Sequence, residues 1–114
     1  MERRRIGENA ELAAVDLLQA QGAEVLLRNV RYRFGELDIV ARDGGTLAVI
    51  EVRKRTNSRF GGAAASVDFR KQGKLRRAAA LLLQQRKDLT GLPIRFDVIA
   101  LSATHIEWIK HAFT

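Results

Sequence analysis

The sequence predicts a single α/β domain in which a mixed β-sheet is flanked by helices, in the order α-β-β-β-α-β-β. Apolar residues recur at helical spacing in two segments, and five further segments are short apolar or alternating runs typical of strands. A chain of 114 residues with 46% hydrophobic residues is long enough for one modest core. No repeat, low-complexity tract or linker divides the chain, so residues 1–114 are expected to form one domain.

The two helical segments lie on either side of the first three predicted strands. In residues 6–20 the apolar side chains recur three or four positions apart, and Gly22 is a suitable stop. A second helix is expected from about Asp68 to Lys87, with leucine and alanine inward and a face rich in Arg, Lys and Gln outward. Gly73 weakens the first turns of this helix by about 1 kcal/mol of helix propensity.

Five segments are expected to be strands: residues 24–31, 36–42, 46–54, 94–101 and 105–110. The turn Asp43-Gly44-Gly45 predicts that the second and third form a hairpin. Residues 56–67 read as a mobile loop, and Gly91 and Pro93 separate the second helix from the last two strands.

The charge balance indicates the class of partner. The chain has 20 Lys and Arg against 13 Asp and Glu, a formal net charge of +7, which fits a polyanion, nucleic acid before membrane. The alternative is an incidental excess of arginine. The absence of cysteine excludes disulfides and thiolate-bound zinc. No apolar stretch approaches a transmembrane length and the N-terminus does not resemble a signal sequence, so a cytoplasmic location is expected.

Acidic residues stand in two of the apolar strands. Residues i and i+2 of a strand point to the same face, so Glu36 and Asp38 should point together, and Glu51 and Arg53 should do likewise on the next strand. Carboxylates in an apolar sheet are costly unless something compensates them. Mg²⁺ or Mn²⁺, bound by hard oxygen ligands, is an obvious candidate, and in a basic chain this suggests metal-assisted phosphodiester chemistry on nucleic acid.

Six short motifs follow one another along the chain: Ile6-Gly7-Glu8-Asn9-Ala10, Arg28-Asn29, Gly35-Glu36-Leu37-Asp38-Ile39-Val40, Glu51-Val52-Arg53-Lys54-Arg55, Lys71-Gln72 and Arg95-Phe96-Asp97-Val98-Ile99. In these motifs and their order the chain resembles the uncharacterised bacterial YraN-like family. That family in turn resembles Holliday-junction resolvases of the restriction-endonuclease-like, PD-(D/E)xK nuclease superfamily. The resemblance covers essentially the whole chain.

The resemblance implies a restriction-endonuclease-like fold and a nuclease site. Glu8 would be the acid on the first helix, Asp38 the aspartate of the second strand and Glu51 the glutamate of the third, all three as metal ligands. The lysine of the family's Glu-x-Lys pattern falls on Arg53, where this chain departs from the pattern. Arginine supplies positive charge, but its pKa above about 12 prevents it from accepting a proton.

Each of these residues also has a structural interpretation. Glu8 in the first turn of a helix is favoured by the helix dipole alone. Asp38, among apolar neighbours, is open to a buried ion pair with an arginine. Arg53 is open to pairing with Glu51 or Asp38 in an inactive site, and Glu36 is expected only to support the ligands or to face nucleic acid.

Further polar and basic side chains are expected to contact phosphates near the site, without reading sequence. They are Arg55, Arg59, Arg70, Lys71, Gln72 and Lys74. The leading hypothesis is therefore a Mg²⁺- or Mn²⁺-dependent, structure-directed endonuclease, with Glu8, Asp38, Glu51 and Arg53 as catalytic residues and branched DNA as the favoured substrate. A non-catalytic nucleic-acid-binding module and a protein-interaction domain are the competing hypotheses, and a homodimer stays open.

Overall fold

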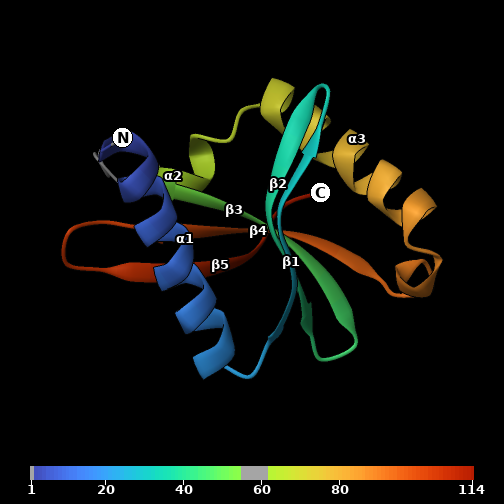
Figure 1. The fold of residues 1–114 in the computed structure, drawn as a ribbon, viewed down its shortest axis with the longest axis horizontal. Helices are drawn as coiled ribbons and strands as arrows, with labels where there is room; N and C mark the ends of the chain where they lie inside the picture. The colour runs from blue at the N-terminus through green and yellow to red at the C-terminus, as the bar shows by residue number, and fades with distance from the viewer. Residues whose placement is uncertain (1, 55–61) are drawn as a thin grey trace.

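The structure is a computed structural model, and it describes residues 2–54 and 62–114 of the chain, with side chains described over 9–54 and 64–114. Two long helices lie on opposite sides of one sheet (Figure 1). The elements in chain order are α1 (Glu2–Ala20), β1 (Glu24–Tyr32), β2 (Gly35–Asp43), β3 (Thr46–Lys54), α2 (Gly62–Ala65), α3 (Phe69–Gln85), the 3₁₀ helix η1 (Lys87–Leu89), β4 (Ile94–Leu101) and β5 (Ile106–Phe113).

The sheet has the spatial order β1-β2-β3-β4-β5, and all neighbours are antiparallel except β3 and β4. The predicted hairpin is confirmed: Asp43 pairs with Thr46 across Gly44-Gly45, and Gly44 has φ +60°, a conformation that glycine adopts without steric cost. The parallel pair β3–β4 needs a long crossover, which α2, α3 and η1 provide. The mixed sheet and the α-β-β-β-α-β-β order predicted from the sequence are confirmed.

Each face of the sheet packs against one long helix. Alternate residues of β3 point in opposite directions, so Leu47 and Val49 join the core under α3 while Ala48 and Ile50 join the core under α1. The helix residues buried against these faces are Ala14 and Leu18 of α1, and Leu75, Ala78, Ala79 and Leu82 of α3.

The helix ends show why these segments fold locally. Asp68 precedes α3 and its Oδ1 accepts a hydrogen bond from the backbone N–H of Lys71 at 2.9 Å, an N-cap that leaves Gly73 inside an intact helix. α1 ends where Gly22 adopts φ +88°.

Most element ends lie within two residues of the predicted ones, and the larger differences are in three places. α1 begins at Glu2 rather than near residue 6, because its first turn is made of residues with good helix propensity. The predicted loop over 56–67 contains the short helix α2, and the rest of that loop up to residue 61 lies outside the described residues. The last strand runs to Phe113, three residues beyond its expected end. No helix in the described ranges is long and apolar enough to cross a membrane.

Candidate metal site

The candidate site lies where β2 and β3 stop pairing. Their ladder runs from Asp43↔Thr46 to Ile39↔Ile50, and both strands continue beyond the last pair while diverging (Figure 1). At the point of divergence Asp38 Oδ2 accepts a hydrogen bond from the backbone N–H of Val52 at 2.9 Å. The Asp38 carboxylate thus takes the place of a main-chain carbonyl of β2 as the acceptor for Val52. This hydrogen bond holds Asp38 where β2 and β3 separate.

Asp38 lies in an environment that disfavours its charged form. Burial, the negative charge of Glu51 and a side-chain hydrogen bond with Glu51 raise the pKa of Asp38 to about 7, against the opposing effects of the Val52 N–H and Lys71. The alternative of a buried Asp38–arginine ion pair has no support among the described residues. A cation placed beside Asp38 would oppose the effects of burial and of Glu51 by stabilising the charged carboxylate.

Glu51 is the more deeply buried of the two carboxylates, with 5% of its surface exposed. Its Oε2 lies 3.1 Å from Arg53 Nη2 and 3.5 Å from Lys71 Nζ. Arg53 comes from the same face of β3, as the alternation of the strand predicts, and Lys71 comes from the first turn of α3. The pairing of Arg53 with Glu51, left open by the sequence, is therefore present, and a lysine accompanies it.

The Arg53 guanidinium is only partly satisfied by this contact. Its side chain is 29% exposed, and its Nε is buried without a hydrogen-bond partner in the described part of the protein. A buried donor without a partner is costly, so the pair with Glu51 alone does not account for the position of the Arg53 side chain.

A second group of carboxylates surrounds Asp38 on the side of α1. One oxygen from each of Glu11, Glu36 and Asp38 lies within 4.8 Å of the others. Glu11 and Asp38 also line a cavity of about 250 Å³ together with Val52 and Lys54. Asp38 therefore belongs to both groups, Glu51 on one side and Glu11 with Glu36 on the other.

Arginines partly neutralise this group from β1. Arg28 Nη2 lies 3.4 Å from Glu11 Oε2, and Arg31 Nε lies 3.5 Å from Glu36 Oε2. Surface pairs of this kind contribute about 0 to 1 kcal/mol, so they leave the carboxylates available to a stronger cation.

Of the predicted site residues, the structure brings together Asp38, Glu51, Arg53 and Lys71. Gln72 instead holds the start of α3, since its Nε2 donates to the carbonyl of Val67 at 2.9 Å. The remaining predicted contacts divide into two groups. Arg70 and Lys74 are exposed on α3, whereas Arg55, Arg59 and the side chain of Glu8 lie outside the described residues.

Glu11 was not among the site residues predicted from the sequence. It follows Glu8 by three positions, and a helix brings residues three or four apart onto one face. Ala14 and Leu18 continue that face into the core, so the stripe 11, 14, 18 was readable as the side of α1 that meets the sheet. Glu11 lies beside Asp38, the position that was expected for Glu8.

A second buried acid, Asp97 of β4, has a structural role. It is fully buried and accepts hydrogen bonds from Arg95 Nε and Nη2 at 2.8 Å, Trp108 Nε1 at 2.9 Å and the backbone N–H of His111 at 2.9 Å. His111 has φ +55°, beside a shift in the β4–β5 register. With all of its oxygen lone pairs directed at donors, Asp97 fixes this irregular edge strand and is not free to bind a metal.

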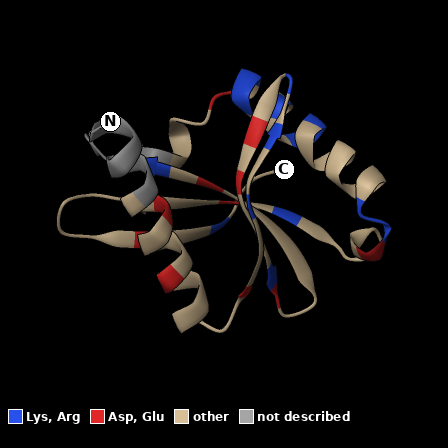
Figure 2. Ribbon diagram, in the orientation of Figure 1, with Lys and Arg blue, Asp and Glu red and all other residues tan. Residues whose placement is uncertain are grey.

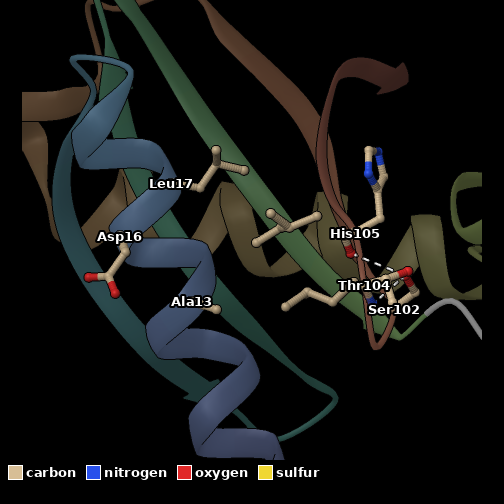
Figure 3. Close-up of a pocket in the computed structure, with 8 residues that line it drawn as sticks. Ala13, Asp16, Leu17, Ser102, Thr104 and His105 are labelled. Carbon is tan, nitrogen blue, oxygen red and sulfur yellow. Dashed lines mark hydrogen bonds between the residues drawn. The ribbon is translucent and has the colours of Figure 1, made fainter.

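A further cavity, of about 510 Å³, lies between α1 and the turn joining β4 to β5 (Figure 3). Its floor is apolar, with Leu17, Leu101 and Ile106. Asp16 points away from His105 (Figure 3), so the two do not form a catalytic pair. The polar groups at the turn bond to each other, Ser102 Oγ donating to the carbonyl of His105 at 3.3 Å.

Comparison with known proteins identifies the family that the sequence motifs suggested. Proteins named UPF0102 protein are similar over nearly the full length: 47% identity over 116 residues in Pseudomonas savastanoi pv. phaseolicola, covering 97% of this chain and 94% of the relative. A protein of Ectopseudomonas mendocina is 48% identical over 111 residues, covering 95% and 93% of the two chains. One of Xanthomonas oryzae pv. oryzae is 47% identical over 113 residues, covering 97% and 93%. Residues 10–101 match the uncharacterised protein family UPF0102, and the chain belongs to this YraN-type family.

Proposed function

We propose that the protein is a metal-dependent endonuclease of nucleic acid, with Mg²⁺ or Mn²⁺ as cofactor and branched DNA as the favoured substrate. The observation that carries the proposal is the pair Asp38–Glu51 at the opening between β2 and β3. Burial and repulsion from Glu51 raise the pKa of Asp38 to about 7 in a strongly basic chain. Carboxylates held together at such a cost are typical of a functional site.

The donor set fits a hard divalent cation. Carboxylate oxygens are the ligands that Mg²⁺ and Mn²⁺ prefer, and Asp38, Glu51 and Glu11 would hold the ion, with Glu36 beside them. When bound, such an ion polarises a phosphoryl oxygen and lowers the pKa of a water that it binds. Glu11 replaces Glu8 as the described acid of α1 in this assignment, while Glu8 stays a prediction.

Arg53 and Lys71 would together perform the functions of the family's strand lysine, Arg53 by its positive charge and Lys71 by donating a proton. Hydrolysis forms a bond between the oxygen of water and phosphorus, which releases a proton from that water, and breaks the bond to the leaving sugar oxygen, which takes up a proton. Arg53, whose side chain is 29% exposed, offers positive charge to the phosphate, but a guanidinium does not transfer a proton. Lys71, whose Nζ lies 3.5 Å from Glu51 Oε2, would donate a proton to the leaving sugar oxygen.

The second candidate function is a nucleic-acid-binding module with a degenerate site. The ion pair between Arg53 and Glu51 favours it, because it engages one of the two central carboxylates. The two functions differ in one measurable property: only the enzyme requires a divalent ion held by Asp38 and Glu51.

Calorimetric titration with MgCl₂ and MnCl₂ tests the metal site first. The wild-type protein should bind, Asp38→Asn and Glu51→Gln should lose binding, and Glu24→Gln should not, since Glu24 is an exposed acid at the far end of β1. Binding that is absent, or that survives both site variants, contradicts the metal-dependent function and leaves the binding module.

Cleavage assays then test the chemistry on four-way junctions, flaps, single strands and linear duplexes. Asp38→Asn, purified in parallel, excludes a contaminating nuclease. Lys71→Arg keeps a positive charge beside Glu51 but removes the transferable proton, so cleavage should fall by about 100-fold or more while metal binding persists. Unchanged cleavage in Lys71→Arg would remove this residue from the reaction.

A further inference from the structure

Basic side chains from two elements meet beside the carboxylate site. The tip of the β1–β2 hairpin packs against α3: a methyl group on the Cα of Gly35 would lie 3.6 Å from the Cβ of Lys74, and the Arg77 guanidinium lies 5.3 Å from the centre of the Phe34 ring. Lysine and arginine of both elements gather at this end of the molecule (Figure 2). We call this the hairpin–helix basic surface, formed by Arg31, Arg33, Arg70, Lys74 and Arg77.

The charges of this surface are weakly compensated. All five side chains belong to exposed residues, and Arg70, Lys74 and Arg77 follow one another at positions i, i+4 and i+7 on one face of α3. Within the described ranges, Arg33, Arg70 and Lys74 have no ion-pair or hydrogen-bond partner, and Arg31 has Glu36 at 3.5 Å. Like charges gathered in this way repel one another, and a polyanion relieves that repulsion.

We propose that the hairpin–helix basic surface binds the phosphate backbone of a double-stranded nucleic-acid arm and directs it to the carboxylate site. The inference rests on the proposed function for its second part, because Lys71, between Arg70 and Lys74 on α3, is the residue that reaches Glu51. The stripe from Arg70 to Arg77 is about 10 Å long at 1.5 Å per residue. One strand of duplex DNA presents a phosphate about every 3.4 Å of axis, so the stripe matches about three phosphates.

The aromatic residues of the hairpin tip favour a duplex over a single strand. Proteins that hold single strands offer free ring faces on which bases stack. Here Tyr32 and Phe34 stack on each other, with ring centres 6.4 Å apart, and Arg77 covers Phe34. The two rings therefore pack within the hairpin tip and do not offer a face to bases. The charged groups of the surface are left to bind phosphates. An anionic membrane would attract the same charges, so anionic vesicles are one arm of the test.

The test measures binding of a fluorescein-labelled duplex, and of one of its strands alone, by anisotropy in EDTA over about 50 to 200 mM salt. Arg33→Gln/Arg77→Gln removes two charges from the surface. Lys87→Gln/Lys110→Gln removes two from elsewhere, Lys87 lying beyond the far end of α3 and Lys110 on β5. Thermal unfolding of each variant confirms that it is folded.

The surface variant should bind duplex at least about tenfold more weakly at 100 mM salt, with a log–log salt slope smaller by about 2, while the control pair binds as wild type. Equal losses in both pairs overturn the proposal, since net charge alone would explain them. Anionic vesicles that bind more tightly than duplex also overturn it. Phe69, 84% exposed at the start of α3, is the side chain on which a base of a single strand could stack, so Phe69→Ala is tested with the single strand. Tighter binding of the single strand, lost in Phe69→Ala, would contradict the duplex assignment.

These results are separable from those for the proposed function. Binding in EDTA requires no metal, so duplex binding that depends on Arg33 and Arg77 in a protein without divalent-ion binding supports the surface and contradicts the nuclease. If Arg33→Gln/Arg77→Gln binds Mg²⁺, cleaves nucleic acid and binds duplex as tightly as wild type, the result supports the nuclease and contradicts the role of the surface.

Discussion

Replacing Asp38 with asparagine should stabilise the protein, and the gain should grow with pH. The pKa of Asp38 is about 7 in the folded protein, against an ordinary value of 3.8. A carboxyl group whose pKa is raised by folding contributes stability below its unfolded pKa and loses that contribution as pH rises through the folded pKa. Asparagine resembles the protonated carboxyl group at every pH, so the variant keeps this contribution to stability as pH rises.

The magnitude follows from the two pKa values. They differ by about 3 pH units, and each unit corresponds to about 1.4 kcal/mol, so the upper limit of the gain is about 4 kcal/mol at pH 8 and above. Near pH 4 the gain should vanish, because both proteins are then uncharged at this position. Asparagine Oδ1 retains the acceptor for the Val52 N–H, so the hydrogen bond at the divergence of β2 and β3 is kept.

Urea unfolding between pH 4 and pH 9 in EDTA measures the effect. The matched control, Asp16→Asn, removes an exposed carboxylate of α1 and reports the loss of one surface charge. A free-energy difference between Asp38→Asn and wild type that does not change with pH would refute the reasoning, as would an asparagine variant less stable than wild type at pH 8.

Divalent ions should reverse the comparison. An ion that binds only the folded wild type stabilises it by about 2.7 kcal/mol when present at 100 times its dissociation constant. The advantage of Asp38→Asn at pH 8 should therefore shrink on addition of MgCl₂, because the variant lacks the ligand. An advantage that is the same with and without MgCl₂ would show that Asp38 holds no ion.

Three further predictions concern other carboxylates and their partners. Arg53→Lys restores the family's Glu-x-Lys pattern beside Glu51, so Mg²⁺-dependent cleavage should rise while stability changes by less than about 1 kcal/mol; a destabilised, inactive variant would identify a structural arginine. Glu11→Gln should weaken divalent-ion binding in calorimetry without unfolding the protein, and unchanged affinity would exclude Glu11 as a ligand. Asp97→Asn should lower the free energy of unfolding by about 2 kcal/mol or more, because it removes the buried carboxylate that accepts from Arg95 and leaves that guanidinium with Asp43 alone; denaturant unfolding measures this.

The sequence by itself determined the elements and the faces of the strands. Gly44-Gly45 between two alternating runs placed the β2–β3 hairpin, and the period of two along β3 put Glu51 and Arg53 on one face. These features depend on neighbouring residues along the chain, so local periodicity and turn chemistry are sufficient to predict them. The same reasoning placed the acids of the site on adjacent strands.

Only the tertiary structure decided which groups meet at those acids. Lys71 reaches Glu51 because α3 packs across the face of the sheet that carries Glu51, and Glu11 approaches Asp38 because α1 packs across the other. The raised pKa of Asp38 arises from burial and from a neighbour on another strand. Contacts between residues distant in sequence depend on how helices seat on a sheet, which no local pattern specifies; for that physical reason Lys71 was expected to contact phosphates and Glu11 was missed.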